Sequence, residues 1–237
     1  MGQAVVTAVS DADGMSVVAE LDMGDKLTYT IQDTQAKVVV DFTHPSAVKK
    51  NVIEILNAGA YPVVGTTGLS DADLAEIDAL AKAKGLAAAV CPNFAIGAVL
   101  MMQAAAQIGK HMPQCEIIEF HHNNKADAPS GTAIKTAELI AISNPEINKA
   151  LVDRTETHIV PETRGGKKAN IPIHAVRLQG FVASQEIIFG GLGQTLTLRH
   201  DTINRESFMP GVVLCVRKIH SKTGLIYGLE NFLNETE

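Results

Sequence analysis

Hydrophobic and polar positions along the first part of the chain follow two alternating periods. The short apolar runs predict buried strands; they are "MSVVAEL", "KVVVDF", "YPVVG" and "LAAAVC". Between them, "HPSAVKKNVIEILNAG" and "SDADLAEIDALAKAKG" place apolar residues at helical spacing. Strands that alternate with helices of this length indicate βαβ units and a parallel sheet.

The two predicted helices carry recognisable end signals. Pro45 lies in the first turn of one helix, and Gly59 follows its last turn. In the other, Ser70 is the expected N-cap, with Asp73 three residues later and Gly85 as the stop. The sequence therefore predicts helices that begin and end at these residues.

Beyond this region the pattern changes. Helices are predicted by "AIGAVLMMQAAAQIGKHM" and "TAIKTAELIAI", with the strand "CEIIEFHH" between them. Residues 144–170 are polar and predict irregular surface, whereas "IPIHAVRL", "FVASQEIIFG" and "QTLTLRH" alternate in the manner of antiparallel strands. The last helix, "RESFMPGVVLCVRKIH", is expected to return to the first domain. We expect a domain of residues 1–94, completed by 205–237, and a second domain of residues 95–204.

Composition narrows the class of protein. Of the 237 residues, 46% are hydrophobic and 19% charged, and the net charge of −6 argues against nucleic acid as a partner. No apolar run is long enough to span a membrane, and the N-terminus lacks a signal-peptide pattern. The three cysteines are widely spaced in apolar surroundings, which favours free thiols in a reducing cytoplasm.

Chemistry-bearing residues follow each predicted strand of the first domain. Asp22 ends the first strand, "DFTHP" follows the second, and "GTTG" and "CPNF" follow the third and fourth. In an open parallel sheet, ligands bind outside the carboxyl ends of the strands, and an acid after the second strand typically holds a ribose. Turns between strand and helix also need Gly, Asp and Thr for geometry alone. Four such ends on one edge favour a dinucleotide site.

The stretch "FHHNNKADAPSGTA" holds the second set of candidates. His121 and His122 follow a strand, so their side chains point in opposite directions. Lys125 adds a positive charge, and "DAPSGT" begins a helix whose N-terminus can bind an anion. Together they describe a pocket for a small carboxylate beside a proton donor. A metal site using His121, His122 or Cys115, or a purely structural strand–helix junction, are the alternatives.

At these residues the chain resembles the 4-hydroxy-tetrahydrodipicolinate reductase (dihydrodipicolinate reductase) family of the diaminopimelate and lysine pathway. The resemblance continues through "VDFTHP", "VVGTTG", "PNFAIGAVL", "IPIHAVRLQGFVASQEIIFG", "TLTLRHD" and "RESFMPGV", in the family's order. It implies a Rossmann-type parallel sheet domain and an α+β domain with a mainly antiparallel sheet for substrate binding and oligomerisation. The family reduces a cyclic dicarboxylate with NADH or NADPH and is commonly a homotetramer.

The resemblance also implies residue roles. His121 is the expected general acid/base, with Lys125 as its partner in proton donation. The substrate carboxylates are expected to bind His122, Ser130, Gly131 and Thr132. The nicotinamide side of the dinucleotide is expected to meet Gly65, Thr66, Thr67, Cys91, Pro92, Asn93 and Phe94. Asp22 matches the acid at the adenine ribose, and Arg205 and Phe208 match a family pair near the domain junction. No metal is expected.

Two departures from the family pattern affect the cofactor. Met23 follows Asp22 where members that favour NADPH often have Arg, which tilts the expectation towards NADH, although Lys26 can compensate. The family opens with a strand and a glycine fingerprint, of which only Gly2 has a counterpart. Either the native protein begins roughly a dozen residues earlier, as a strand plus glycine turn requires, or the chain starts here and binds dinucleotide poorly.

Three functions follow. The first is reduction of the cyclic dicarboxylate; the second is an oxidoreductase on the same scaffold that acts on another carboxylate. The third is a dicarboxylate-binding chain whose dinucleotide binding is impaired by the missing strand. Retained NADH affinity distinguishes the first two from the third, and a substrate panel separates the first from the second.

Overall fold

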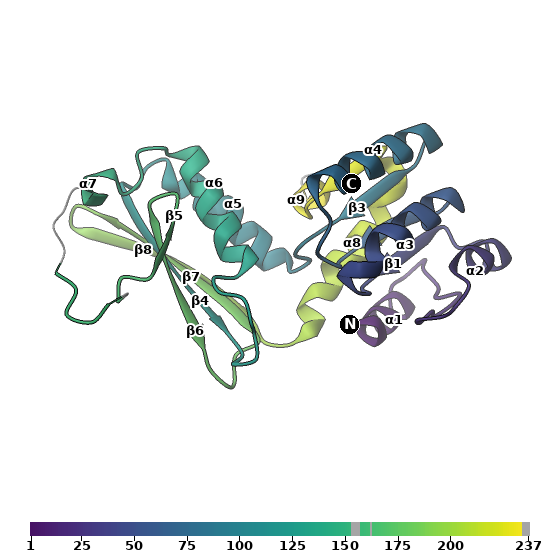
Figure 1. The fold of residues 1–237 in the computed structure, drawn as a ribbon, viewed down its shortest axis with the longest axis horizontal. Coiled ribbons are helices and arrows are strands. Elements are labelled where there is room, and N and C mark those ends of the chain that lie inside the picture. Colours follow the sequence, from purple (N-terminus) through teal and green to yellow (C-terminus); the bar gives the residue numbers. More distant parts are fainter. Residues whose placement is uncertain (153–156, 162, 234–237) are drawn as a thin grey trace. The chain divides into compact units, whose positions relative to one another are not determined.

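The chain folds into two compact units, each built around its own sheet (Figure 1). The computed structural model describes residues 1–152, 157–161 and 163–233. Unit 1 comprises Met1–Ile96 and Arg205–Glu237, and unit 2 comprises Gly97–Asn204. The mixed α/β class with one parallel and one mainly antiparallel sheet is the class that the sequence predicts.

Unit 1 contains a four-stranded parallel sheet, sheet A. Its strands lie in the order β1 (Val38–Asp41), β2 (Tyr61–Val64), β3 (Ala87–Val90) and β9 (Gly224–Tyr227). The helices of unit 1 are α1 (Gly2–Ser10), α2 (Leu27–Thr34), α3 (Pro45–Asn57), α4 (Asp71–Lys84), α8 (Met209–Lys218) and α9 (Glu230–Leu233), with short 3-10 helices at Arg205–Phe208 and Ile219–Ser221. The sequence did not predict α2 or β9.

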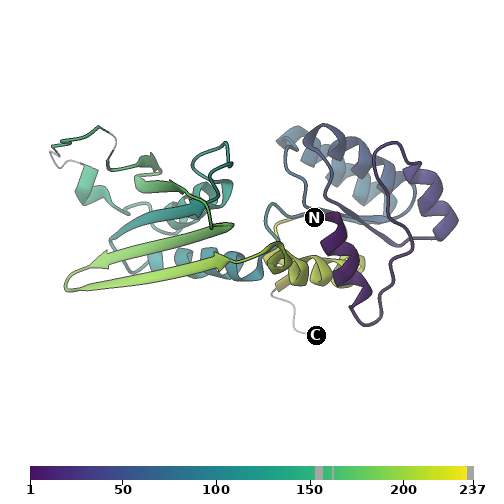
Figure 2. The same cartoon turned by 90° about the horizontal axis from the view of Figure 1, so that it is seen from below.

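Helices cover both faces of sheet A. Helices α3 and α4 lie on one face and α8 on the other, with α1 packed against α8 (Figures 1 and 2). The inward face of α3 carries Val48, Val52 and Leu56, which pack with Ile77 of α4 and strand residues such as Val64. Parallel strands buried on both faces need continuous apolar runs, which explains the Val- and Ala-rich strand sequences.

The helix ends of unit 1 follow the predicted signals. Ser70 and Asp73 form a reciprocal capping box at the start of α4, and Gly85 ends that helix in a left-handed conformation. Pro45 opens α3, and Gly59 follows its end with a φ of +87°. These five positions are confirmed because local backbone requirements alone decide them.

The predicted strand "MSVVAEL" is wrong. Residues 15–22 form no strand, and Val18 and Leu21 are largely exposed. An extended segment becomes a strand only when a neighbouring strand pairs with its backbone. Sheet A ends at β1, and none of the described strands pairs with the outer edge of β1. The apolar pattern is present, but the partner that would complete it is not in the described part of the chain.

Unit 2 contains a five-stranded sheet, sheet B. Its strands lie in the order β5 (Gly166–Lys168), β6 (Ile171–Arg177), β4 (Gln114–His121), β7 (Ala183–Gly191) and β8 (Gln194–Thr202). All neighbouring pairs are antiparallel except β4 and β6, which run parallel. The predicted mainly antiparallel sheet is confirmed, and the parallel pairing of β6 with β4 is its one exception among the described strands. Period-two alternation identifies a strand with one packed face but does not identify the direction of its neighbour.

Helices α5 (Ile96–Gly109) and α6 (Gly131–Ser143) are predicted by the sequence and form as expected. Helix α6 packs against β4, β5 and β6. The core beneath it joins Ile117 of β4, Ile187 and Phe189 of β7, and Ile140 of α6. The alternation along β4 therefore assigns one of its faces to the helix layer.

The polar stretch of residues 144–170 is more regular than expected. It contains α7 (Lys149–Val152) and strand β5, whereas residues 153–156 and 162 lie outside the described part. Within the described residues, no helix has the length and apolarity to cross a membrane.

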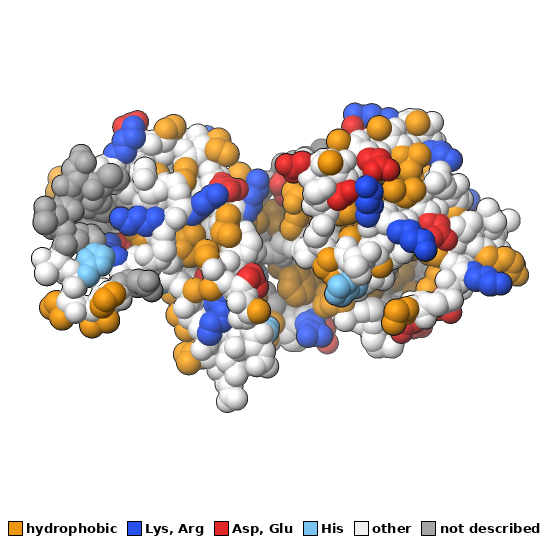
Figure 3. Space-filling view, in the orientation of Figure 1, with side chains coloured by type: hydrophobic (Ala, Val, Ile, Leu, Met, Phe, Trp, Pro, Cys, Tyr) orange, Lys and Arg blue, Asp and Glu red, His pale blue; other side chains and the backbone are white. Residues whose placement is uncertain are grey.

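On the face of unit 1 in Figure 3, acidic and basic side chains are interspersed over α3 and α4. There the Lys49 amine bridges Asp73 (2.7 Å) and Glu76 (2.8 Å). Exposed pairs of this kind contribute little to stability, typically about 0–1 kcal/mol.

Candidate active site

The end of strand β4 positions the histidine. Residues two apart on a strand point to the same face, so Glu119 and His121 both face the helix layer. Glu119 is fully buried, and the His121 side chain is 14% exposed. His122 lies just beyond the strand and is exposed. The prediction that the two histidines point to different surroundings agrees with this exposure.

The Glu119 carboxylate organises the surroundings of His121. Its Oε2 lies 2.5 Å from His121 Nδ1, and the Arg177 guanidinium donates to both oxygens, at 2.7 and 2.8 Å. Arg177 ends strand β6 and lies opposite His121 in the parallel register. Parallel pairing of β4 and β6 therefore brings the two carboxyl ends, and with them an acid, a base and a cation, to one place.

Glu119 is ionised at neutral pH. Burial raises the pKa of its carboxyl, but hydrogen bonds from His121 and Arg177 outweigh burial and lower that pKa to about 2. An ionised carboxylate only accepts hydrogen bonds, so Nδ1 of His121 is the donor. The neutral imidazole then has its lone pair on Nε2, the atom through which it can exchange a proton.

Lys125 lies in the loop between β4 and α6. Its amine donates to both oxygens of Asp127, at 2.7 and 2.9 Å. This amine holds the pKa of the Asp127 carboxyl below its usual range. The Lys125 side chain is 21% exposed, so solvent and small anions reach it. In this arrangement a bound carboxylate competes with Asp127 for the amine.

The start of α6 carries the Ser-Gly-Thr sequence. Ser130 is the N-cap: its hydroxyl accepts from the Ala133 N–H at 3.2 Å, and its own N–H donates to Glu119 Oε1 at 3.1 Å. Ser130 is buried, whereas Gly131 is exposed and Thr132 half-buried. The first-turn N–H groups of a helix attract anions, and Gly131 adds no side chain above them.

The metal interpretation gains no support from the geometry. Cys115 lies near the opposite end of β4 from the histidines and is buried in the core of unit 2. Burial raises the pKa of its thiol to about 12. Within the described residues, no group of three His, Cys, Asp or Glu side chains is placed to hold a metal ion.

Unit 1 brings together a second set of candidates at the carboxyl edge of sheet A. Asp41 ends β1, is almost fully buried, and accepts from the Thr43 N–H and hydroxyl, the Thr66 hydroxyl (2.8 Å) and the Asn51 amide (2.9 Å). It thereby ties the turns after β1 and β2 to helix α3. Thr66 is therefore buried as part of the framework, whereas Thr67 beside it is exposed.

Two glycines of the Gly-Thr-Thr-Gly turn have different requirements. A Cβ on Gly65 would lie 2.1 Å from the Phe42 ring, so this position is glycine for packing. Gly68 has a φ of +105° and is exposed. The backbone from Thr67 to Gly68 is thus accessible to a ligand at this edge.

Buried side chains pack beneath the turn that follows β3. Phe94 is buried and packs against Phe42, with ring centroids 5.6 Å apart. Cys91 is buried, and its Sγ lies 3.9 Å from Cys215 Sγ, a contact that together with burial raises the pKa of the Cys91 thiol far above its ordinary range. Pro92 is exposed, and the Asn93 side chain accepts from the Ala95 N–H at 2.8 Å. Only Pro92 and the half-buried Asn93 are open to a ligand here.

Asp22 is not placed at the end of a strand. It is exposed and accepts from the Met23 N–H at 2.7 Å within its own turn. Because residues 15–22 form no strand, the described structure does not bring Asp22 to the sheet edge as the sequence predicts.

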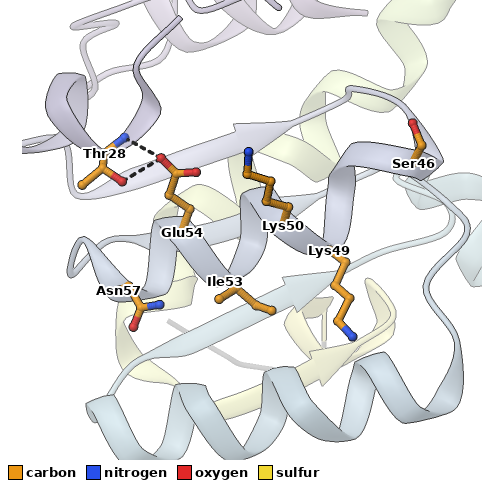
Figure 4. A pocket seen from close by; sticks show the side chains of 7 residues that line it. All are labelled: Thr28, Ser46, Lys49, Lys50, Ile53, Glu54 and Asn57. Carbon is orange, nitrogen blue, oxygen red and sulfur yellow. Dashed lines mark hydrogen bonds between the residues drawn. The ribbon is translucent and has the colours of Figure 1, made fainter. Parts of the chain in front are cut away.

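A hollow in unit 1 lies elsewhere, along the outward face of α3 (Figure 4). In it, Glu54 accepts from the N–H and hydroxyl of Thr28, while Lys49 and Lys50 extend in different directions. None of the predicted site residues lines this hollow. It is a solvated helix face rather than the candidate site.

Glu119, Arg177 and Asp41 are not among the site residues that the sequence predicts. A signal existed for Glu119, because the pattern Glu-x-His on a strand with a buried face places both side chains together. No local signal pointed to Arg177, since its role depends on the parallel pairing of β6 with β4. Asp41 lies within the quoted "DFTHP", but its burial follows from the tertiary structure.

Known protein families match almost the whole chain. Residues 1–94 match the family described as "Dihydrodipicolinate reductase, N-terminus", and residues 97–233 match "Dihydrodipicolinate reductase, C-terminus". The 4-hydroxy-tetrahydrodipicolinate reductase of Desulfitobacterium hafniense is 44% identical, over 98% of this chain and 94% of the relative. That of Dictyoglomus turgidum is also 44% identical, over 100% of this chain and 95% of the relative.

Solved structures give the same result. A dipicolinate-bound dihydrodipicolinate reductase from Paenisporosarcina sp. TG-14 has a TM-score of 0.86 and 40% identity, covering 98% of this chain and 95% of that one. An amine dehydrogenase from Mycobacterium smegmatis has a TM-score of 0.59 at 10% identity, covering 95% of this chain and 91% of its own. The second likeness extends to the fold alone.

Proposed function

This chain belongs to the dihydrodipicolinate reductase family, and on that premise we propose that it reduces 4-hydroxy-tetrahydrodipicolinate with a nicotinamide nucleotide. Unit 2 binds the cyclic dicarboxylate and carries the proton-transfer groups. The predicted domain of residues 1–94, completed by 205–237, binds the dinucleotide. The product is tetrahydrodipicolinate, an intermediate of diaminopimelate and lysine synthesis.

The substrate carboxylates bind where unit 2 concentrates positive potential. The exposed N-terminus of α6 at Gly131 and Thr132 offers backbone N–H groups, and the Thr132 hydroxyl adds a donor. His122 is exposed, and the Lys125 amine already holds one carboxylate, that of Asp127. Ser130 acts through its cap, which keeps this first turn in place.

His121 handles the proton. Its Nδ1 is committed to the Glu119 carboxylate, so Nε2 is the atom that gives or takes a proton at the substrate. Lys125 assists as a second acid, since its ammonium group donates three hydrogen bonds and stabilises negative charge that develops nearby.

The carboxyl edge of sheet A fits the nicotinamide end of a dinucleotide. The exposed backbone at Thr67 and Gly68, together with Pro92 and Asn93, provides the accessible part of this edge. Gly65, Thr66, Cys91 and Phe94 support it from below. When bound, the reduced nicotinamide supplies the hydride. The ribose-binding role of Asp22 requires its segment to move to the sheet edge.

Three finer points extend the proposal. We expect NADH to be preferred mildly over NADPH, because Met23 follows Asp22 and only Lys26 offers a nearby positive charge. We expect a cytoplasmic enzyme, consistent with three buried free cysteines.

We also expect a homotetramer joined through sheet B. Its face opposite α6 carries the half-buried Ile118, Phe120 and Ile188, with Phe120 packed against Phe181 and below the Arg199 guanidinium. Apolar side chains on an uncovered sheet face are typical of an interface. Sedimentation equilibrium measures the number of subunits.

The proposal rests mainly on one observation. His121 at the end of β4, Lys125 in the following loop and the N-terminus of α6 lie within one short stretch of the chain. Replacing His121 with Ala is expected to lower kcat by roughly 10²–10⁴-fold, because proton transfer matters mainly in the transition state. Thr132→Val is the matched control and is expected mainly to raise KM. Steady-state kinetics with NADH and NADPH measure both, and equal kcat in wild type and the His121 variant would contradict the role.

The dicarboxylate-binding alternative has its own signature. The chain would then bind pyridine-2,6-dicarboxylate in calorimetry while NADH gave no binding signal. Saturable NADH binding by fluorescence titration excludes this alternative. A panel of other cyclic and linear carboxylates tests whether the reductase acts on a different substrate.

A further inference from the structure

We propose that Glu119 is the positioning residue of the site: its single carboxylate orients the His121 imidazole and fixes the first turn of α6, with Arg177 as its counter-ion. This inference rests on the proposed function. It assigns to one buried side chain the alignment of the proton-transfer group with the carboxylate-binding helix.

Glu119 accepts hydrogen bonds from strand β4, from strand β6 and from the start of helix α6. Oε2 accepts from His121 Nδ1 (2.5 Å) and Arg177 (2.8 Å), while Oε1 accepts from Arg177 (2.7 Å) and from the Ser130 N–H (3.1 Å). Each oxygen thus receives one charged donor and one donor from the candidate site. The carboxylate is fully buried, so water does not substitute for any of them.

The groups around Glu119 connect it to the neighbouring strand, helix and loop. The groups that contact this carboxylate are His121 on its own strand, Arg177 from β6 and the Ser130 N–H at the start of α6. Arg177 also donates to the Asp127 carbonyl oxygen at 2.8 Å, which attaches the loop to the same cluster. The strand, the helix and the loop that supply the proposed site residues of unit 2 therefore all meet at Glu119.

The energetics favour a positioning role over a stabilising one. A buried ion pair is often no more stabilising than apolar side chains of the same volume, because both ions must leave water. An apolar replacement would leave Nδ1 of His121 and the Ser130 N–H without an acceptor. The carboxylate is therefore needed to align His121 and Ser130 rather than to stabilise the fold.

The tautomer of His121 is the direct readout. Long-range ¹H–¹⁵N NMR spectra of the histidine rings, recorded on the full chain where the imidazoles are neutral, distinguish Nδ1–H from Nε2–H. The chain has 8 histidines, and a His121→Gln variant identifies the signal of interest. We expect His121 of the wild type to carry its proton on Nδ1. A neutral Nε2–H ring overturns the proposal without any further variant.

Variants at position 119 then test the cause. Glu119→Gln presents both a donor and an acceptor to His121, so we expect the Nδ1–H signal to fall and the Nε2–H form to appear. Glu119→Asp keeps the charge on a shorter side chain and is expected to retain part of the Nδ1–H population. An unchanged tautomer in Glu119→Gln contradicts the proposal.

Gln185→Leu is the matched control. Gln185 is buried, lies directly across from Glu119 on β7, and donates to the Thr136 hydroxyl at 2.8 Å, but it belongs to neither the catalytic nor the binding set. It is expected to change stability while leaving the His121 tautomer as in the wild type. A tautomer change in this variant as large as that in Glu119→Gln would mean that general loosening of the sheet is the cause, and would overturn the proposal.

Kinetics add a second readout. Glu119→Gln is expected to lower kcat by roughly tenfold or more, because the imidazole is no longer held with the lone pair of Nε2 available for proton transfer. The NMR result does not depend on turnover. If the wild type fails to reduce the substrate, the proposed function fails, whereas the role of Glu119 is still decided by the tautomer.

Discussion

Among the residues that the structure describes, each unit has one buried carboxylate at the carboxyl end of a strand, and the two have different partners. Asp41 in unit 1 accepts only from neutral donors: the Thr43 backbone and hydroxyl, the Thr66 hydroxyl and the Asn51 amide. Glu119 in unit 2 accepts from the Arg177 guanidinium and from a histidine. The same kind of group therefore serves two purposes.

The two carboxylates differ in the donors that would lose their acceptor if the carboxylate were removed. Hydroxyl and amide donors around Asp41 have other rotamers and nearby acceptors. The Arg177 charge has no such freedom, because the guanidinium is always ionised and lies partly buried. The neutral donors around Asp41, the neutral shell, hold the turns of unit 1 together. The charged donors around Glu119, the ionic shell, instead fix the positions of charged groups relative to one another.

The largest expected loss of unfolding free energy follows from a change at Glu119, in the ionic shell. Glu119→Gln is nearly isosteric but removes the carboxylate that Arg177 hydrogen-bonds, and breaking a buried pair in this way typically costs about 3–5 kcal/mol. Urea denaturation followed by far-UV circular dichroism measures the loss, since the chain has no tryptophan. The transition assigned to unit 2 is expected to shift. A loss under about 1 kcal/mol would remove the distinction between the two shells.

The corresponding change in unit 1 is expected to have a smaller effect. Asp41→Asn keeps one oxygen to accept from Thr66 but sets an amide against the amide of Asn51, so we expect a loss of about 1–3 kcal/mol. The same urea experiment is the test, with the shift in the transition of unit 1. A loss equal to that of Glu119→Gln would show that charge on the donors does not matter.

The smallest effect is expected at the helix caps, which form another matched pair. Ser70→Ala removes the exposed capping box of α4 and is expected to cost about 1 kcal/mol with no change in kcat. Ser130→Ala removes the cap of α6 and is expected to weaken binding of pyridine-2,6-dicarboxylate as well. Calorimetry separates the two. Equal dicarboxylate affinity in both variants would argue against the N-terminus of α6 as the binding element.

Local signals in the sequence predicted much of this fold. The capping box at Ser70, the stop at Gly85 and the helix–strand alternation from β1 to β3 depend on neighbouring residues, and all formed as expected. The segment of residues 15–22 failed because a strand needs a partner that no local pattern reports. The parallel pairing of β6 with β4 was not predicted for a related reason, since pairing direction is a property of the sheet.

The candidate site divides in the same way. His121, Lys125 and Ser130 lie in one short stretch, so the sequence and the family resemblance reached them together. Arg177 is far from them along the chain and meets Glu119 only because β6 pairs with β4. Its role required the tertiary structure.

The shared carboxylate also constrains how this site can evolve. Positions 119, 121 and 177 are linked through the same two oxygens, so the effect of a change at one depends on what the others hold. A lineage that replaces any one of them alone passes through an intermediate with an unpaired buried group. Among descendants of this protein, the three positions are therefore expected to change together or to remain as they are.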